Sequence, residues 1–290
     1  MKRAERKKPR GEETDIKLIA LDMDGTLLNE QGVLSEKSRR TLERAMEKGV
    51  HVVIATGRVY SALPRDVVEV PGIEYAITSN GANLLRLADM TTLYSNLLER
   101  ESVEKIMHIM EDPSIMTEVF FDHGVYAERR CLSNLEEFGI VTEKSKRYTL
   151  STREPVDSVL ELIRSNETRL ENINLIFKDM EKRRQVWNEL EQLGDITVTS
   201  SMPYNLELGG ATTSKADALA HLAGILGVER EQIMACGDSV NDLAMLNFAG
   251  FSVAMENGAE PVRKAADFIT KSNGEDGVAY AIETFALKER

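Results

Sequence analysis

The chain has only two cysteines, Cys131 and Cys236, which are too few for a disulfide framework. Cys236 lies inside the apolar run IMACG, so we expect a buried, reduced thiol there. No apolar stretch approaches the roughly 20 residues that a membrane-spanning helix needs. No apolar signal-peptide segment follows the basic start either. These absences argue against a disulfide-stabilised or membrane-spanning protein, and the cytoplasm is the expected location by default.

The chain also lacks an excess of positive charge. Its 36 Lys and Arg stand against 48 Asp and Glu, which gives a formal net charge of -12. Such a surface repels nucleic acid and acidic lipid headgroups, so we expect neither as a partner. A phosphorylated ligand would need local cations or a metal ion to attract it. The sequence leaves the oligomeric state open.

With 290 residues, of which 42% are hydrophobic, the chain can bury a sizeable core, and we predict two domains. Residues 1–15 are polar and are predicted to form a disordered basic arm. Strands alternate with helices over residues 16–83 and 200–290, which predicts an α/β core with a doubly wound parallel sheet. Hairpin signals mixed with helical patterns over residues 84–199 predict a smaller, inserted α+β cap.

The rest of the chain is organised around residues 16–28, which read IKLIALDMDGTLL. The apolar run predicts a buried strand that ends at Asp22 and Asp24, where Gly25 turns the chain away. Buried carboxylates are unfavourable, and two close together are more so. Paired Asp residues at a strand end therefore indicate a compensating cation, usually a metal. The alternative is a solvated loop after a strand.

Polar residues follow other predicted strands as well. The strand at 50–55 runs into Thr56-Gly57-Arg58, the strand at 75–78 into Ser79-Asn80-Gly81, and the strand at 233–236 into Gly237-Asp238. Ligands of open parallel sheets collect outside the carboxyl ends of the strands. The candidate site residues are therefore Asp22, Asp24, Thr56, Gly57, Arg58, Asn80, Asp238, Asn241 and Asp242, with Lys215 at the start of a predicted helix.

Two groups of these residues suggest a chemistry. The carboxylates of Asp22, Asp24 and Asp238 match an oxygen site for Mg²⁺. Hydrogen-bond donors that match the oxygens of a phosphoryl group come from Thr56, Gly57, Lys215 and Asn241. Purely structural roles stay open: helix caps for Thr56 and Asn241, an ion pair for Arg58, an Asn-Gly turn for Asn80 and a solvated side chain for Lys215.

These motifs resemble one known family. DMDGT, the Thr that ends VVIAT, the later Lys and GDSVND, in this order, resemble the haloacid dehalogenase (HAD) superfamily of phosphotransferases. Within this superfamily the chain looks like the Cof-type branch of phosphatases. This resemblance rests on the position of the insertion and on the segments SNGA and GDSVNDLAML. The resemblance covers Ile16 to the C-terminus. Ala216 follows Lys215 where the family usually has Gly, and it could crowd the approach of substrate.

The resemblance implies roles for the candidate residues. Asp22 would be the nucleophile that forms an aspartyl-phosphate, and Asp24 the acid and then the base. Mg²⁺ would be held by Asp22, the backbone carbonyl of Asp24, and Asp238. Thr56 and Lys215 would bind the transferring phosphoryl group and take part in catalysis, and Asn241 would touch the phosphate. Independently of the resemblance, Gly57, Arg58 and Asn80 are predicted to bind substrate because they follow predicted strands. Asp242 would orient Lys215 or the groups around the metal.

The predicted function is a Mg²⁺-dependent phosphatase for small phosphorylated metabolites. Sugar phosphates are the first substrate class and phosphorylated cofactors the second. One alternative is a phosphomutase, which would require a hexose bisphosphate. Another is a protein that binds phosphorylated ligands without hydrolysing them. Asp24 argues against such a binder, because binding alone has no use for an acid/base group two residues from the nucleophile.

Overall fold

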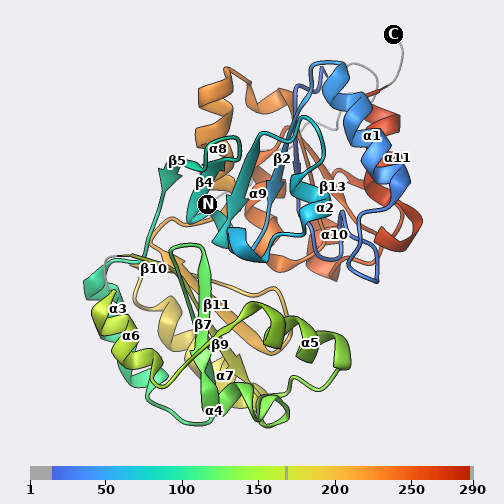
Figure 1. The fold of residues 1–290 in the computed structure, drawn as a ribbon. Helices are drawn as coiled ribbons and strands as arrows, with labels where there is room; N and C mark the ends of the chain where they lie inside the picture. Colours follow the sequence, from blue (N-terminus) through green and yellow to red (C-terminus); the bar gives the residue numbers. More distant parts are fainter. Residues whose placement is uncertain (1–14, 167–168, 288–290) are drawn as a thin grey trace. The chain divides into compact units, whose positions relative to one another are not determined.

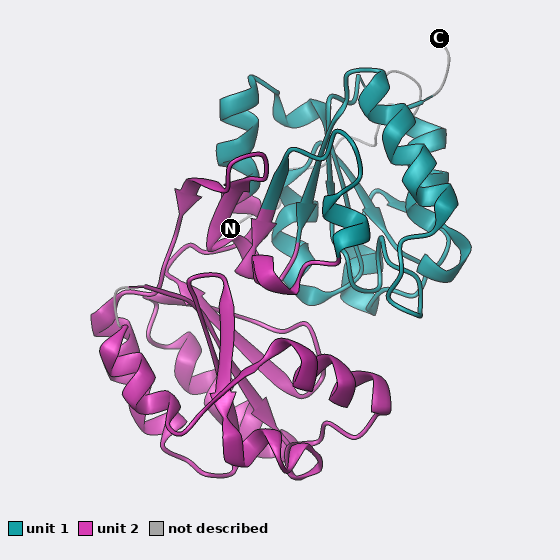
Figure 2. Cartoon of the chain, viewed as in Figure 1, with its two compact units in different colours: residues 1–55, 65–76, 219–290 teal, residues 56–64, 77–218 magenta. Residues whose placement is uncertain are grey.

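The computed structural model describes residues 15–166 and 169–287 (Figure 1). Two compact units make up the chain (Figure 2). Unit 1 contains the described residues of Met1–Ala55, Arg65–Ala76 and Leu219–Arg290, and unit 2 contains those of Thr56–Pro64 and Ile77–Ala218. The arm predicted for residues 1–15 lies outside the described residues, except for Asp15.

Five parallel strands of unit 1 pair in the order β14-β13-β12-β1-β2. Their bounds are Leu18–Leu21 for β1, His51–Ala55 for β2, Ile233–Gly237 for β12, Phe251–Ala254 for β13 and Phe268–Ile269 for β14. Leu21 at the end of β1 lies opposite Ile54 of β2 and Cys236 of β12. Every residue of β1 is buried, as is typical of a parallel strand covered on both faces. The predicted parallel sheet is confirmed.

Helices α1 (Glu36–Glu47) and α11 (Gly277–Phe285) lie side by side, although they come from opposite ends of the sequence (Figure 1). The Ser35 hydroxyl accepts a bond of 3.0 Å from the Ser38 N–H and so caps the N-terminus of α1. Further helices are α2 (Arg65–Val68), α9 (Leu243–Phe248) and α10 (Glu260–Ala265). Strand β3 (Tyr75–Thr78) begins in unit 1 and ends in unit 2, and α8 (Lys215–Leu226) does the reverse.

The six-stranded sheet of unit 2 has the order β10-β11-β9-β6-β7-β8. The bounds are Ile115–Phe121 for β6, Gly124–Glu128 for β7, Glu154–Val156 for β8, Leu170–Phe177 for β9, Ile196–Thr199 for β10 and Asn205–Gly210 for β11. Neighbouring strands within this sheet are antiparallel, except β7 and β8, which are parallel. The predicted β6–β7 hairpin is confirmed, and so is a second one formed by β4 (Asn83–Arg86) and β5 (Thr91–Ser95).

The two faces of this sheet differ in chemistry. Helices α3 (Arg100–Met110), α6 (Val159–Ser165) and α7 (Met180–Glu191) pack on one face through a large apolar core. Side chains alternate along a strand, so the neighbours of those core residues point to the other face. That face carries buried polar side chains, namely Glu118, Asn172, Asn174, Asn205 and Glu207. The helices α4 (Arg129–Leu132) and α5 (Glu143–Thr152) complete the unit.

Three details differ from the sequence prediction. The core was expected to resume at residue 200, but β11 pairs with β9 and β10 in the six-stranded sheet. The sequence pattern of Ser133–Phe138 favours a helix, but the structure has α4 before this segment and a 3₁₀ turn at Leu135–Phe138 within it. Helix α5 was not predicted. The division into units also cuts the chain at other positions than the predicted domain limits, which stay a prediction.

A buried ion pair joins α5 to the polar face. Both guanidinium Nε and Nη2 of Arg153 donate to the Glu118 carboxylate, at 2.8 and 2.9 Å, and Glu118 is 0% exposed. Burial works to lower the pKa of Arg153, but the Glu118 charge outweighs it and raises that pKa above its usual value. The arginine is thus charged at every working pH.

Removing one partner of this pair should be strongly destabilising. We expect Arg153→Met to lower the free energy of unfolding by about 3–5 kcal/mol, because it strands the Glu118 carboxylate without its counter-ion. Urea unfolding followed by circular dichroism measures this. Arg184→Met, which removes the exposed partner of Glu181, is the control and should change stability by less than about 1 kcal/mol. Equal effects of the two variants would contradict the assignment.

Both cysteines are buried and free, which confirms the thiol predicted for Cys236. Burial raises the pKa of Cys131 to about 11 and that of Cys236 to about 12, so neither forms a thiolate readily. Among the described residues, no helix combines the length and the apolar character that crossing a bilayer requires.

Candidate active site

The DMDGT motif forms a tight turn directly after β1 of unit 1. Asp22 is 6% exposed, and its N–H donates to the Cys236 carbonyl at 3.1 Å, which continues the pairing of β1 with β12. The Asp22 carbonyl then accepts from the Leu27 N–H at 3.2 Å. Within this turn Gly25 has a φ of 82°, in the left-handed region that favours glycine. The turn leaves Asp22 buried and Asp24 exposed.

Asp238 follows β12 and its carboxylate is held from two sides. Its Oδ1 accepts from the Thr26 hydroxyl at 2.8 Å, and its Oδ2 accepts from the Ser239 hydroxyl at 3.1 Å. A Cβ added at Gly25 would lie 2.5 Å from Oδ2 of Asp238. The glycine therefore serves two needs, a left-handed backbone and a close approach of the carboxylate.

Asp242 is fully buried and fixes the loop that carries Asp238. Its Oδ2 accepts from the N–H groups of Asp238 and Ser239, both at 2.9 Å. A Cβ at Gly237 would lie 2.6 Å from the Asp242 Cβ and 2.7 Å from its carboxylate, so only glycine fits at the end of β12. The 3₁₀ turn Val240–Asp242, which contains Asn241, is closed in this way by its own acidic residue.

The carboxylates of Asp22, Asp238 and Asp242 each offer an oxygen, and these oxygens all lie within 4.8 Å of one another. Carboxylates this close together disfavour their shared charged form unless a cation lies near them. An oxygen-only donor set suits a hard divalent cation such as Mg²⁺. The residues present therefore fit a metal ion. The Asp24 side chain is not part of the cluster, and the family resemblance assigns its backbone carbonyl, rather than its carboxylate, to the metal.

In unit 2, the residues after β2 and β3 are bound to each other. The Thr56 hydroxyl accepts from the Arg58 N–H at 3.1 Å, and the Thr56 N–H donates to the Ile77 carbonyl at 2.9 Å. The Asn80 N–H donates to the Thr56 carbonyl at 3.0 Å, and the Ser79 N–H to the Arg58 carbonyl at 2.9 Å. Four of the predicted substrate-binding residues, Thr56, Gly57, Arg58 and Asn80, thus belong to two adjoining loops.

Side-chain contacts fix two of these residues further. The Arg58 guanidinium donates through Nη1 to the Ala62 carbonyl at 2.9 Å and lies 4.7 Å from the ring centroid of Tyr148. Asn80 is buried with a φ of 56°, so it is a turn residue, and its Nδ2 also donates to Oε2 of Glu207 at 2.7 Å. Tyr148 and Glu207 come from the inserted part of unit 2.

Lys215 is the first residue of α8, as predicted, and is 0% exposed. The alternative of a solvated lysine on a helix surface is therefore wrong. A buried ammonium group requires compensating polar or charged neighbours, which is unusual for a residue without a function. A Cβ at Gly81 would lie 2.1 Å from the Ser214 carbonyl oxygen and 3.0 Å from the Lys215 nitrogen, so the start of α8 rests directly on the Asn80-Gly81 turn.

Several residues of this region were missed by sequence reasoning. Thr26 and Ser239 stand inside the quoted motifs, and their hydroxyls could have been recognised as hydrogen-bond donors to the Asp238 carboxylate. Glu171 and Glu207 stand in strands among apolar residues, where a buried acidic residue is a weak signal. Of the three clustered carboxylates, those of Asp22 and Asp238 were predicted as metal ligands, and that of Asp242 was not.

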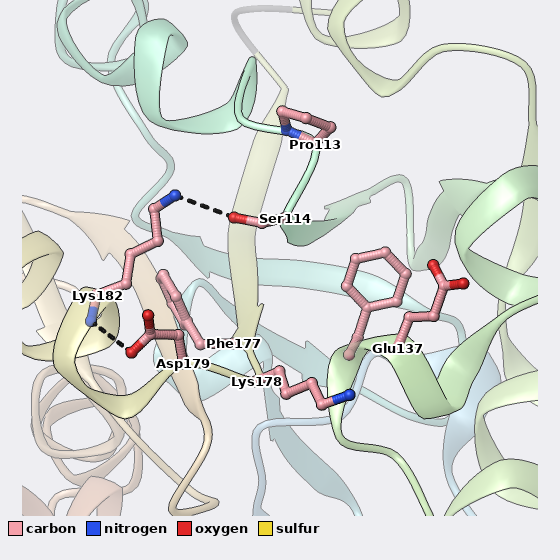
Figure 3. Close-up of a pocket in the computed structure, with 8 residues that line it drawn as sticks. Pro113, Ser114, Glu137, Phe177, Lys178, Asp179 and Lys182 are labelled. Carbon is pink, nitrogen blue, oxygen red and sulfur yellow. Dashed lines mark hydrogen bonds between the residues drawn. The ribbon is translucent and has the colours of Figure 1, made fainter.

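Unit 2 also has a surface pocket of about 390 Å³, which contains none of the predicted residues. Figure 3 shows its lining, in which Lys182 donates to Ser114 at 3.0 Å. Lys182 also binds Asp112 and holds the pKa of that carboxyl down at about 2. The lining mixes two lysines, Lys178 and Lys182, with the acids Glu137 and Asp179, and Lys182 is already paired with an acid.

The sequence model of the haloacid dehalogenase-like hydrolases matches residues 19–282. The chain belongs to this family. One relative of this HAD-like hydrolase is the 5-amino-6-(5-phospho-D-ribitylamino)uracil phosphatase YcsE of Bacillus subtilis, 34% identical over 95% of this chain and 98% of the relative. Another is the phosphatase YwtE of B. subtilis, named for the same substrate, 31% identical over 92% of this chain and 97% of the relative.

A solved haloacid dehalogenase-like hydrolase from B. subtilis has the same fold, with a TM-score of 0.81 and 30% identity over 92% of this HAD-like hydrolase and 99% of that chain. These findings confirm the predicted family, the enzyme class of hydrolases and the α/β core with an inserted cap. They do not test the individual site residues, whose roles stay a prediction.

Proposed function

We propose that this HAD-like hydrolase is a Mg²⁺-dependent phosphatase that cleaves small phosphomonoesters through an aspartyl-phosphate on Asp22. The observation that carries the proposal is the cluster of Asp22, Asp238 and Asp242 oxygens within 4.8 Å, beside a turn that exposes Asp24. The relatives that are named phosphatases support the reaction class.

In this mechanism an Asp22 oxygen attacks phosphorus, and the bond from phosphorus to the ester oxygen breaks. Asp24 gives its proton to the departing alkoxide and then takes a proton from the water that hydrolyses the aspartyl-phosphate. Because the Asp24 side chain is exposed, it can reach both the leaving group and the attacking water. Mg²⁺, when bound by the carboxylates of Asp22 and Asp238, would neutralise charge on the phosphoryl oxygens.

The other predicted residues act on binding and charge. Thr56, Gly57 and Asn241 would donate hydrogen bonds to phosphoryl oxygens, and the Lys215 ammonium would offset their negative charge. Arg58 and Asn80 would contact the substrate beside them. The Asp242 carboxylate accepts hydrogen bonds from the N–H groups of Asp238 and Ser239 and so orients the loop that carries Asp238. Its proposed role is to position this metal ligand. Positioning and electrostatics supply most of the rate gain in phosphoryl transfer.

The substrate we propose is a phosphate ester of a small hydroxylated molecule. Sugar phosphates fit this description, and so does the 5-phosphoribitylamino compound named for the relatives. The acidic surface agrees with a small ligand rather than a nucleic acid. A cytoplasmic location is proposed with it, since such metabolites are found there.

Removing divalent metal should abolish turnover. We expect EDTA to reduce phosphate release from a panel of sugar phosphates and 5-amino-6-(5-phospho-D-ribitylamino)uracil by at least about 100-fold, and excess Mg²⁺ to restore it. Phosphate is measured colorimetrically. Turnover that resists EDTA would contradict the metal assignment. A requirement for a hexose bisphosphate would favour the phosphomutase, and binding without release over hours would favour the non-hydrolytic alternative.

A further inference from the structure

Three consecutive residues of unit 2 have a left-handed backbone. Ser79, Asn80 and Gly81 have φ values of 49°, 56° and 105°. Only the last is a glycine, and non-glycine residues adopt such angles only where the surroundings hold them. We refer to these residues as the Ser79–Gly81 turn. Left-handed non-glycine residues concentrate at functional sites, and this turn contains the predicted substrate-binding residue Asn80.

Two buried carboxylates hold the side chains of this turn. Oε2 of Glu171 accepts from the Ser79 hydroxyl at 2.6 Å, and Oε2 of Glu207 accepts from Asn80 Nδ2 at 2.7 Å. Glu171 is 3% exposed and Glu207 is 8% exposed. Both stand on the six-stranded sheet, in the paired strands β9 and β11. Hydrogen bonds to an ionised carboxylate are about twice as strong as those between neutral groups.

The remaining oxygens of the two carboxylates are anchored as well. Oε1 of Glu207 accepts from Ser201 and from Asn205 Nδ2, and Oε1 of Glu171 accepts from the His123 N–H at 3.0 Å. Each glutamate therefore joins the Ser79–Gly81 turn to a fixed point of the inserted sheet. Burying an acid is unfavourable compared with an apolar residue of similar size, so packing alone does not explain the pair.

The bond to Glu207 also sets which way the Asn80 amide points. Only the NH₂ group can donate to a carboxylate, so Nδ2 must face Glu207. Oδ1 then lies on the side of Gly57, where an added Cβ would be 3.1 Å away. An asparagine without this partner could present either end of its amide. Glu207 thereby fixes the polarity that Asn80 offers to a ligand.

We propose that Glu171 and Glu207 are positioning residues that hold the Ser79–Gly81 turn and orient Asn80 toward the substrate. This inference rests on the proposed function for the substrate role of Asn80. Neither glutamate touches the reacting atoms. Replacing either glutamate should weaken substrate binding. For Glu207 the weakening should come from the lost orientation of Asn80.

A double-mutant cycle tests the role of Glu207. Glu207→Gln keeps the shape but replaces one acceptor by an NH₂ donor. Because Ser201 and Asn205 both donate to one side of this residue, the glutamine oxygen stays there and the NH₂ group turns to Asn80, whose amide must then reverse. We expect Glu207→Gln and Asn80→Ala each to raise KM about tenfold with kcat changed less than about threefold. The double variant should be no worse than Asn80→Ala alone, because the group that Glu207 orients is already gone. Multiplying effects would overturn the proposal.

Glu118→Gln is the matched control for this cycle. Glu118 is another buried glutamate of the same sheet, but its carboxylate binds Arg153 and Asn174 instead of the turn. Any change in KM that it causes should multiply with that of Asn80→Ala. If Glu207→Gln does not fold, Ser201→Ala removes only one anchor of Glu207 and should raise KM by about threefold, again without further effect beside Asn80→Ala.

Hydrogen–deuterium exchange separates this proposal from the proposed function. Glu171→Gln and Glu207→Gln should each speed amide exchange of residues 79–82 about tenfold relative to the rest of the sheet. Glu118→Gln, which weakens the whole unit through Arg153, should not single out these residues. Unchanged exchange would overturn the clamping of the turn, whatever the activity. Faster exchange with unchanged KM would overturn the link to substrate. A wild-type protein without phosphatase activity would contradict the proposed function, while the exchange result would still decide whether the glutamates hold the turn.

Discussion

Asp22→Asn should reduce phosphate release by about 10⁴-fold or more, because it removes the nucleophile while keeping the size of the side chain. Loss of a nucleophile commonly leaves only the rate that binding and charge stabilisation supply. The measurement is steady-state turnover of p-nitrophenyl phosphate with Mg²⁺, in parallel with the best substrate of the panel. Undiminished turnover would contradict the proposed mechanism.

The same variant has a second expected readout, in stability. Without metal, the crowded oxygens of Asp22, Asp238 and Asp242 repel one another, so a neutral Asn should leave the melting temperature unchanged or higher. With Mg²⁺, the wild type should gain stability by binding the ion, and the variant should gain less. A fold defect would instead lower the melting temperature under both conditions.

Asp267→Asn is the control for this prediction. Asp267 also belongs to unit 1 and its Oδ2 accepts from the Ser252 N–H and hydroxyl, at 3.0 and 2.7 Å, but it stands outside the carboxylate cluster. It should lose stability and keep turnover within about twofold of the wild type. Together the two variants separate the loss of an acidic group from the loss of the nucleophile.

The parts of the fold that could be predicted are those with an unambiguous local pattern. Strand β1 is an unbroken apolar run with charge before it and a glycine turn after it, which fits only a buried strand. The β6–β7 hairpin has Asp122 and His123 at its turn, and both take the positive φ that short hairpins require. Such features depend on neighbours in sequence, so the sequence displays them.

The pairing of β11 could not be predicted in the same way. Its residues read NLELGG, an alternating strand pattern that says nothing about which strand lies beside it. The antiparallel contact with β9 is long-range and depends on which face is buried. Helix α5 was missed for a related reason, since Thr149 is the one buried residue within it and its apolar face is weak.

In the candidate site, too, residues with a distinctive local sequence could be predicted, and residues that only burial sets apart could not. Asp22, Asp24 and Asp238 could be proposed from the sequence because acidic residues at strand ends have a recognisable sequence context. The structure brings Asp22 and Asp238 together with Asp242. Glu171 and Glu207 look in the sequence like outward-facing residues of a half-exposed strand, and only the tertiary structure shows them buried. Burial also distinguishes Lys215 from an ordinary surface lysine, which the sequence could not do.

Gly25→Ala should reduce turnover by about 100-fold and raise the Mg²⁺ concentration needed for half-maximal activity. Its new Cβ would stand 2.5 Å from Oδ2 of Asp238, a contact that real Cβ atoms do not make. The carboxylate must move, although Thr26 and Ser239 hold it in place, and a displacement of about 1 Å in such a site can change rate by about 100-fold. Titration of activity with Mg²⁺ measures both effects.

Gly32→Ala separates this contact from simple backbone strain. Gly32 has a φ of 79°, almost that of Gly25, but nothing lies within 4 Å of its added Cβ. Both alanine variants should therefore lose about 1 kcal/mol of stability from the left-handed backbone. Only Gly25→Ala should change the Mg²⁺ dependence. If both variants lost activity equally, strain would explain the loss, and the close approach of Gly25 to Asp238 would have no catalytic meaning.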